Sequence, residues 1–180
     1  RPMFFEKIEK IILNFKEIIK TSFSNDEIYQ IFQTNKRLLL FLIEENILKF
    51  DEKIYSLNKC NREFLLYFYP EFSNFIVSSL MQRKNGFNHI IENFKNDEDE
   101  FIKKRKVGEN DSYICELIRN DDIGNFITHV EKNHISLNSR IQSSIYETNV
   151  PLIRLSSQNY KGQELNLIVY TLYFGSIQIF

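Results

Sequence analysis

The sequence contains no alanine and no tryptophan, and it has only 5 glycines and 3 prolines among 180 residues. Tight β-hairpins need glycine, Asn-Gly or Asp-Gly at fixed turn positions, so this shortage argues against a sandwich of many strands. Without alanine, helices must pack through bulkier side chains, which keeps their backbones further apart. The composition therefore favours an all-α fold.

Long apolar runs are also missing. The longest, residues 38–43, has six residues, whereas a transmembrane helix needs roughly 20. We therefore expect no membrane partner. The chain shows no secretory hydrophobic segment, which predicts a cytoplasmic protein, with the nucleus as the alternative. Because residue 1 is Arg rather than Met, we expect a processed or truncated chain, or an incomplete gene model.

Charge of either sign is nearly balanced, with 23 basic and 24 acidic residues. Nucleic acid would favour a basic face, so we expect no nucleic-acid partner. The basic run 103–106 follows an acidic run at 97–100. The basic run alone suits a nuclear import signal or a nucleic-acid patch, but we interpret the two runs together as a surface segment that compensates its own charge.

Only two cysteines are present, Cys60 and Cys115. One disulfide is arithmetically allowed, but disulfides belong to oxidising compartments and nothing in the sequence indicates one. We therefore expect two reduced thiols that are buried like small apolar side chains.

The sequence is rich in apolar residues at helical spacing. In residues 3–21 they recur at steps of three and four and predict one amphipathic helix: Ile8, Ile11, Ile12, Phe15, Ile18 and Ile19. Ser24 and Glu27 have the spacing of a capping box, which predicts the start of a second helix. Residues 38–43 favour helix over strand because their neighbours are helical.

Further helices are expected where a capping side chain or a proline marks a start. Asp51 and Asn61 are candidate caps, and Pro70 suits the first turn of a helix. Another helix is expected at residues 87–94. Residues 107–110 are interpreted as a linker, which predicts an N-terminal helical domain at 1–106 and a second domain at 107–180.

The second domain begins with a predicted helical hairpin at residues 112–130, where two short apolar faces flank a polar turn. Residues 133–138 then alternate apolar and polar residues, which predicts a short extended finger. His134, Ser136 and Asn138 lie on this finger and are the candidate partner-binding residues.

A similar pattern restarts at residues 167–180. With a shift of 54 residues, Gly175 falls on Asp121, Ile177 on Ile123 and Phe180 on Phe126. Each unit would leave an apolar face that needs a neighbour, as in a solenoid. This predicts one near-complete ankyrin-like repeat at 111–138 and one truncated at 167–180, with irregular structure at 139–166. The alternative is two unrelated hairpins.

Specific strings in this pattern resemble a known family, the large ankyrin-repeat proteins of parasitic flagellate protists. The strings are residues 31–45, 105–120, 133–138, 144–149 and 173–180. In those proteins a helical domain of unknown function precedes the ankyrin array. The resemblance runs over most of the chain but departs at residues 150–166 and at Thr171-Leu172. It implies repeats that continue beyond Phe180.

No motif for catalysis or metal binding stands out. The glycines do not cluster into a phosphate loop, and no serine lies in a Gly-x-Ser-x-Gly elbow. His129 and His134 are five residues apart, so they cannot stack on one helical face, and Cys115 has no paired neighbour. We therefore expect no cofactor and no metal site. The triplet 110–112 matches a glycosylation acceptor, but we interpret it as the cap of the following helix.

Together these features predict an N-terminal helical domain followed by the start of an ankyrin-like helical-hairpin solenoid. The predicted function is that of a non-catalytic scaffold or adaptor that binds a protein partner. Two alternatives stay open. One is a truncated structural remnant without independent activity, which would self-associate through its uncapped C-terminal end. The other is a small helical enzyme.

Overall fold

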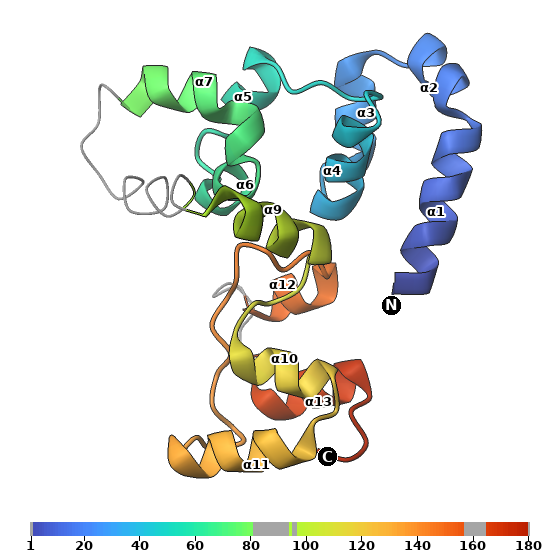
Figure 1. Cartoon of the computed structure of the whole chain (residues 1–180). Helices are drawn as coiled ribbons and strands as arrows, with labels where there is room; N and C mark the ends of the chain where they lie inside the picture. The colour runs from blue at the N-terminus through green and yellow to red at the C-terminus, as the bar shows by residue number, and fades with distance from the viewer. Residues whose placement is uncertain (1, 81–93, 95–96, 157–164, 180) are drawn as a thin grey trace. The chain divides into compact units, whose positions relative to one another are not determined.

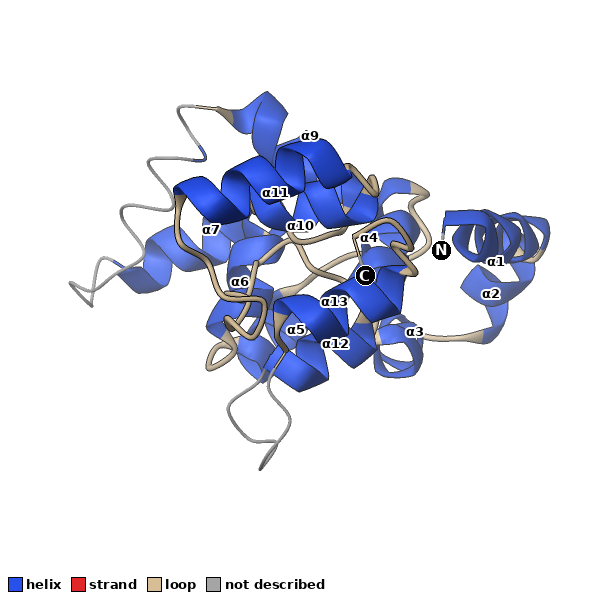
Figure 2. Ribbon diagram, turned by 90° about the horizontal axis from the view of Figure 1, so that it is seen from below, coloured by secondary structure: helices blue, strands red, loops and turns tan. Residues whose placement is uncertain are grey.

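The computed structural model describes residues 2–80, 94, 97–156 and 165–179 (Figure 1). Within these ranges the secondary structure is helical, apart from turns, loops and one isolated antiparallel bridge between Arg140 and Asn166 (Figure 2). The all-α prediction is confirmed for the described residues. The helix expected at 87–94 falls almost entirely outside them.

The chain divides into two compact units, Arg1–Glu98 and Asp99–Phe180. Unit 1 contains α1 (Pro2–Asn14), α2 (Lys16–Ser22), α3 (Asn25–Phe32), α4 (Lys36–Glu44), α5 (Glu52–Asn58), α6 (Arg62–Tyr67) and α7 (Tyr69–Leu80). Unit 2 contains nearly all of α9 (Glu98–Val107), then α10 (Tyr113–Arg119), α11 (Ile123–Lys132), α12 (Val150–Ser156) and α13 (Leu167–Phe174). The division precedes most of α9, whereas the sequence interpretation placed almost all of this helix in the first domain.

Capping side chains start most helices of unit 1. At Ser24 both bonds of the predicted capping box are present, and the Ser24 backbone amide donates to the Glu27 carboxylate at 2.8 Å. Asp51 and Asn61 accept the amide hydrogens of the residues three positions later, at 2.9 and 3.1 Å. Pro70 lies in the first turn of α7. The helix starts predicted at Ser24, Asp51, Asn61 and Pro70 are therefore confirmed.

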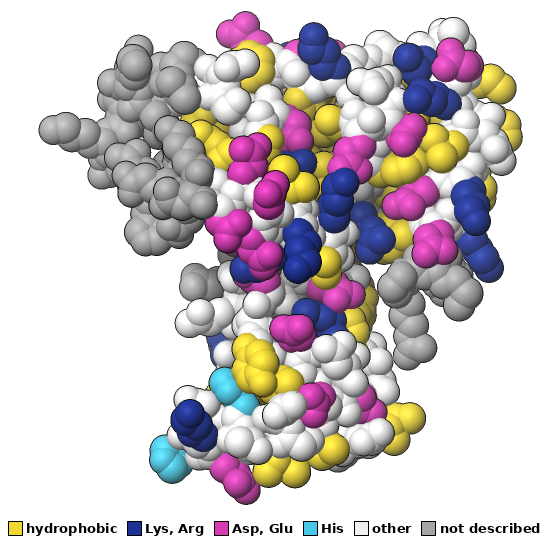
Figure 3. Space-filling view, viewed as in Figure 1, with side chains coloured by type: hydrophobic (Ala, Val, Ile, Leu, Met, Phe, Trp, Pro, Cys, Tyr) yellow, Lys and Arg dark blue, Asp and Glu magenta, His cyan; other side chains and the backbone are white. Residues whose placement is uncertain are grey.

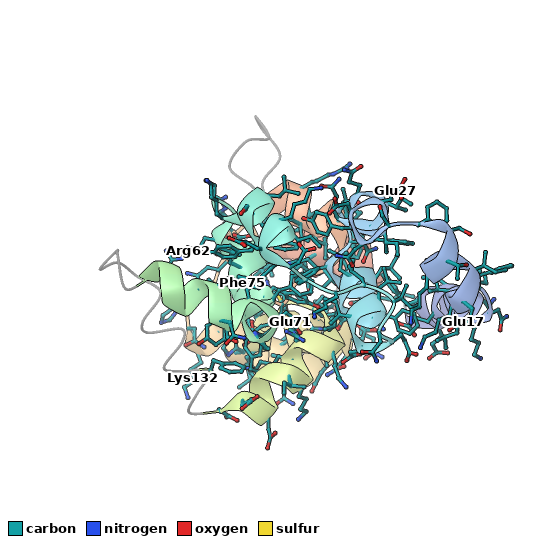
Figure 4. All side chains as sticks on the ribbon, turned by 90° about the horizontal axis from the view of Figure 1, so that it is seen from above. Glu17, Glu27, Arg62, Glu71, Phe75 and Lys132 are labelled. Atoms are coloured by element: carbon teal, nitrogen blue, oxygen red, sulfur yellow. The ribbon has the colours of Figure 1, made fainter. Side chains whose placement is uncertain are left out.

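Aromatic rings form much of the core of unit 1. Phe50 stacks on Phe72 with ring centroids 4.7 Å apart, and it packs edge-on against Phe68 at 4.9 Å. Phe75, labelled in Figure 4, stacks on Tyr55 at 5.6 Å. Offset and edge-on rings give a dense core from large side chains, which suits a chain without alanine.

The helix predicted for residues 3–21 is divided at Phe15, whose φ of −105° and ψ of 9° leave the helical region. The Phe15 amide donates to the Ile11 and Ile12 carbonyls and closes α1, and the Phe15 carbonyl accepts from the Ile19 amide at the start of α2. The prediction of one helix was wrong here. Breaks usually occur at proline or glycine, and neither marks this position.

Unit 2 has a core of its own, in which α11 and α13 both pack against α10. Cys115 of α10 is fully buried in this core, whereas Cys60 of unit 1 is exposed. Both thiols are free. The expected burial of both cysteines is therefore confirmed for Cys115 and wrong for Cys60, which lies between the short helices α5 and α6.

Candidate functional site

The predicted helical hairpin is present as α10 and α11, joined by a tight turn. Asp121 takes the left-handed conformation with a φ of 53°. The amides of Asp121 and Asp122 donate back to Ile118 and Leu117 at 3.1 and 3.0 Å, which closes α10. The Asp122 side chain then accepts the Asn125 amide at 3.2 Å and caps α11. The turn reverses the chain within a few residues.

Helix α13 begins in the same register as α10, and the left-handed residues that follow the two helices are also in register, although α13 is one residue longer. Its N-cap Asn166 comes 54 residues after Ser112, the N-cap of α10. The Asn166 side chain accepts the Val169 amide at 2.9 Å, whereas the Ser112 side chain makes no capping bond, so the cap predicted at 110–112 has the expected position but not the expected hydrogen bond. Its left-handed C-cap Gly175, with a φ of 67°, comes 54 residues after Asp121. The amides of Gly175 and Ser176 donate to Leu172 and Thr171 in the pattern seen at Asp121. Helices α4 and α11 close in this way too, so the shared register at both ends is the distinctive feature.

The two helices differ in how much of their surface is covered. Ile118 of α10 is fully buried, whereas Leu172, the residue 54 positions later, is 57% exposed. Tyr173 is also exposed, and Ile177 beyond the helix is 85% exposed. We call Leu172, Tyr173 and Ile177 the α13 face. These exposed apolar side chains lie on α13 and in the turn after it, and Ile118, the α10 counterpart of Leu172, is covered.

The expected opening of a second helix after Gly175 is instead a turn at residues 177–179. The Asp121 carboxylate accepts the amide hydrogens of Gln178 at 3.1 Å and Ile179 at 3.3 Å. These amides have the positions that lack partners at the start of a helix. Asp121, from the turn after α10, accepts them as a capping side chain would. Phe180, which the sequence superposed on Phe126, lies outside the described residues.

The three predicted partner-binding residues, His134, Ser136 and Asn138, are exposed. They do not form an extended finger, because the segment makes two successive turns. His134 has a φ of 51°, and the Ser136 hydroxyl accepts the Asn138 amide at 3.2 Å. Short polar side chains offer the backbone such local hydrogen bonds and so compete with extended structure. In Figure 3 the histidine side chains, coloured cyan, lie near α11.

Unit 2 also contains a polar cluster that the sequence did not indicate, centred on Arg119 of α10. Its guanidinium forms an ion pair with Glu109 at 2.7 Å and donates to the Asn110 carbonyl at 2.7 Å. It also donates to the Tyr170 hydroxyl of α13 at 2.9 Å. Arg119 therefore ties the segment before α10 to α13.

A second part of the cluster forms around Glu147, which is buried. Its carboxylate accepts the Asn149 backbone and side-chain amides at 2.8 and 2.7 Å, and the Asn110 amide at 3.3 Å. Burial raises the pKa of Glu147. Asn110 also donates from its side chain to the Gln142 carbonyl at 2.9 Å. These bonds hold residues 142–149 against the start of α10.

Burial governs the pKa values of the titratable groups in and beside the cluster. Burial raises the pKa of the Cys115 thiol, which keeps it protonated, and the thiolate is the nucleophilic form. Burial likewise raises the pKa of the Tyr170 hydroxyl. The Glu147 carboxylate and the Arg119 guanidinium both hold backbone groups of this unit. The arrangement can position segments, and we assign it that role.

The charged runs around α9 compensate each other at Glu100, but the segment does not lie wholly at the surface as the sequence interpretation expected, because Arg105 of the basic run is buried. Glu100 pairs with Lys103 at 3.9 Å and with Lys104 at 3.8 Å, and Lys104 also pairs with Asp111 at 3.2 Å. Among the described residues, no His, Cys, Asp or Glu side chains gather in threes to hold a metal ion. The helices described include none with the length and apolar character needed to cross a membrane.

Comparison of the chain with protein-family models, with curated proteins and with solved structures gives no match. The resemblance to protist ankyrin-repeat proteins therefore stays a prediction.

Proposed function

We propose that the chain is a non-catalytic protein–protein interaction module, in which unit 2 is the start of an ankyrin-like array of helical hairpins. The α13 face is the surface at which the next element of such an array, or a protein partner, binds. The exposed turns that carry His134, Ser136 and Asn138 at the end of α11 form a second candidate contact.

The observation that carries this proposal is the shared register of α10 and α13. The two helices begin 54 positions apart, and the left-handed residues that follow them, Asp121 and Gly175, are also 54 positions apart. Ile118 is covered, whereas its counterpart Leu172 is exposed. In stacked helical repeats, a helix inside the array is covered by its neighbours, whereas the corresponding helix at the end of the array is exposed. The polar cluster supports the proposal, because it fixes the loops between the repeated helices.

A photo-crosslinking experiment tests the proposal. The crosslinking amino acid p-benzoylphenylalanine is placed at Leu172 in the full chain, and the protein is irradiated in a cell lysate. The matched control carries it at Leu57, an exposed apolar residue of unit 1. We expect discrete protein adducts from position 172 that exceed those from position 57.

Competition then separates specific from incidental adducts. Unlabelled wild-type chain should suppress the adducts at position 172 in a saturable way, and L172E chain should not. Equal adducts at both positions, or equal competition by the two chains, would remove the support for a partner on the α13 face.

A further inference from the structure

The turn after α13 is the counterpart of the start of α11. Asp122, the N-cap of α11, accepts the amide hydrogen of Asn125. A shift of 54 positions places these two residues on Ser176 and Ile179. The Ser176 amide donates back to Thr171 at 3.2 Å, and the Asp122 amide makes the corresponding bond after α10 at 3.0 Å. The chain therefore enters the turn after α13 in the hydrogen-bond pattern with which it enters α11.

Two side chains fix this turn to the end of α10. The Asp121 carboxylate accepts the Gln178 amide at 3.1 Å and the Ile179 amide at 3.3 Å. The Ser176 hydroxyl, which is buried, donates to the carbonyl of Ile118. At the start of α11 the N-cap residue itself accepts the amide, whereas here the carboxylate comes from the preceding hairpin. Two of the amides that a helix start leaves without partners are therefore already satisfied.

We infer that residues 176–179 are a helix-initiation site, and that a helix continuing from Ile179 is the element that covers the α13 face. Fixing the first turn is the costly step in forming a helix, and the folded unit has already fixed this one. A carboxylate at this position also interacts favourably with the dipole of the helix that starts there. The inference rests on the proposed function, because it names the element that occupies the proposed binding surface.

The surface beside this turn suits a helix that packs through apolar side chains. Helix α13 contains no charged residue, and its Leu172 and Tyr173 are exposed. Helix α11 packs against α10 and places Phe126 in the core of unit 2. In the sequence, Phe180 occupies the position 54 residues after Phe126. A helix in this register brings to α13 the residue type that α11 brings to α10.

An extended chain tests this inference. Residues 127–138, which complete α11 and include the turns after it, are copied and joined after Phe180, so that the copy continues in the register of α11. The reference is a free peptide with the sequence of the copy, because so short a helix is marginal in water. Hydrogen exchange on the extended full chain should show the copied amides of 128–132 exchanging at least about tenfold more slowly than in the peptide.

Two variants of the extended chain separate initiation from packing. D121G keeps the left-handed backbone but lacks the carboxylate, and L172E places a charge on the face that the helix covers. Each should lose most of the protection of the copied amides. The matched control is L57E, because Leu57 is an exposed apolar residue of unit 1, and it should leave that protection unchanged. Unchanged exchange of the α10 amides in every variant shows that unit 2 is still folded.

Two results would overturn the inference. The copied amides could exchange as fast as in the free peptide, or their protection could survive both D121G and L172E. Crosslinking from position 172 of the unextended chain distinguishes these failures from failure of the proposed function. Specific adducts together with an unprotected copy mean that the α13 face binds a separate protein and that the turn starts no helix. A protected copy without specific adducts supports the initiation site and contradicts the binding of a partner.

Discussion

Asp121 adopts the left-handed conformation that closes α10, and its carboxylate accepts the amide hydrogens of Gln178 and Ile179. Substitutions at this one position separate the two roles. D121A removes the carboxylate and leaves alanine in the left-handed region, a conformation that alanine tolerates poorly. We therefore expect unit 2 to lose about 1–2 kcal/mol of stability. D121N should stay close to the wild type, because asparagine tolerates this conformation and keeps one acceptor oxygen.

D121G provides the discriminating measurement for Asp121. Glycine adopts the left-handed conformation freely, so D121G should retain most of the thermal stability of the wild type. It should nevertheless lose hydrogen-exchange protection at the amides of Gln178 and Ile179, because the accepting carboxylate is gone. Unchanged protection at these two amides in D121G would contradict the capping role.

Glu147 gives unit 2 a pH dependence with a defined sign. Burial raises the pKa of Glu147 in the folded chain above the ordinary glutamate value of about 4.3. The folded chain then binds this proton more readily than the unfolded chain does. The contribution of Glu147 to the free energy of unfolding therefore increases as the pH falls from neutral, through the folded-state pKa, toward the ordinary value.

The E147Q variant removes this dependence. Urea unfolding at several pH values between 7 and about 4.5 should show the stability of the wild type, relative to E147Q, increasing toward acid. The control is E116Q, since Glu116 is an exposed carboxylate of α10. The difference in the free energy of unfolding between wild type and E147Q could instead stay constant across this range or decrease toward acid. Either result would contradict a raised pKa for Glu147 in the folded chain.

At the scale of elements, two glycines of unit 2 make a matched pair. Gly108 follows α9 with a φ of 70°, and a Cβ there would lie 2.8 Å from the Thr148 hydroxyl oxygen. G108A should therefore destabilise unit 2 by about 1–3 kcal/mol. Gly124 lies within α11, where a Cβ would come no nearer than 3.9 Å to Asp122. G124A should stabilise by about 0.5–1 kcal/mol, because alanine is the better helix former.

Thermal unfolding followed by circular dichroism measures both glycine variants. The two changes add the same methyl group, so opposite signs would show that backbone conformation and the approach of Thr148 decide the outcome. If both variants shifted the melting temperature in the same direction, the close packing of residues 108 and 148 would be in doubt.

Helix starts could be predicted from the sequence because capping is local. Ser24, Asp51 and Asn61 each act on an amide three residues away, and that spacing is visible in the chain. The hairpin of α10 and α11 was predictable because its two apolar faces and the polar turn between them are also local features of the sequence. The break at Phe15 and the turns around His134 were not, because they depend on backbone preferences that no glycine or proline marks.

The polar cluster was beyond prediction because its partners are distant in sequence. Arg119 and Tyr170 are 51 positions apart, and Asn110 and Glu147 are 37 apart. Periodicity shows that Arg119 follows the apolar residues of α10, but it cannot show which segment lies opposite. The α13 face was predicted only in part: the repeated pattern was visible, but the exposure of Leu172 depends on what packs against each copy of the helix.

For the whole molecule, the described residues form two separate apolar cores. The core of unit 1 is built from residues up to position 94, and that of unit 2 from residues 114 onward. Leu39 of α4 and Leu152 of α12 are both fully buried, one in each core. Replacing a buried leucine by alanine removes apolar contacts and leaves a cavity, at a cost of about 2–5 kcal/mol.

Because neither core uses residues of the other, L39A and L152A should act on different units. L39A should lower hydrogen-exchange protection in α3 to α6 and leave the amides of α10 as protected as in the wild type. L152A should do the reverse. Native-state hydrogen exchange on the full chain measures both effects in one protein, with each variant serving as the control for the other. Loss of protection in both units from either substitution would mean that the chain unfolds as one cooperative body.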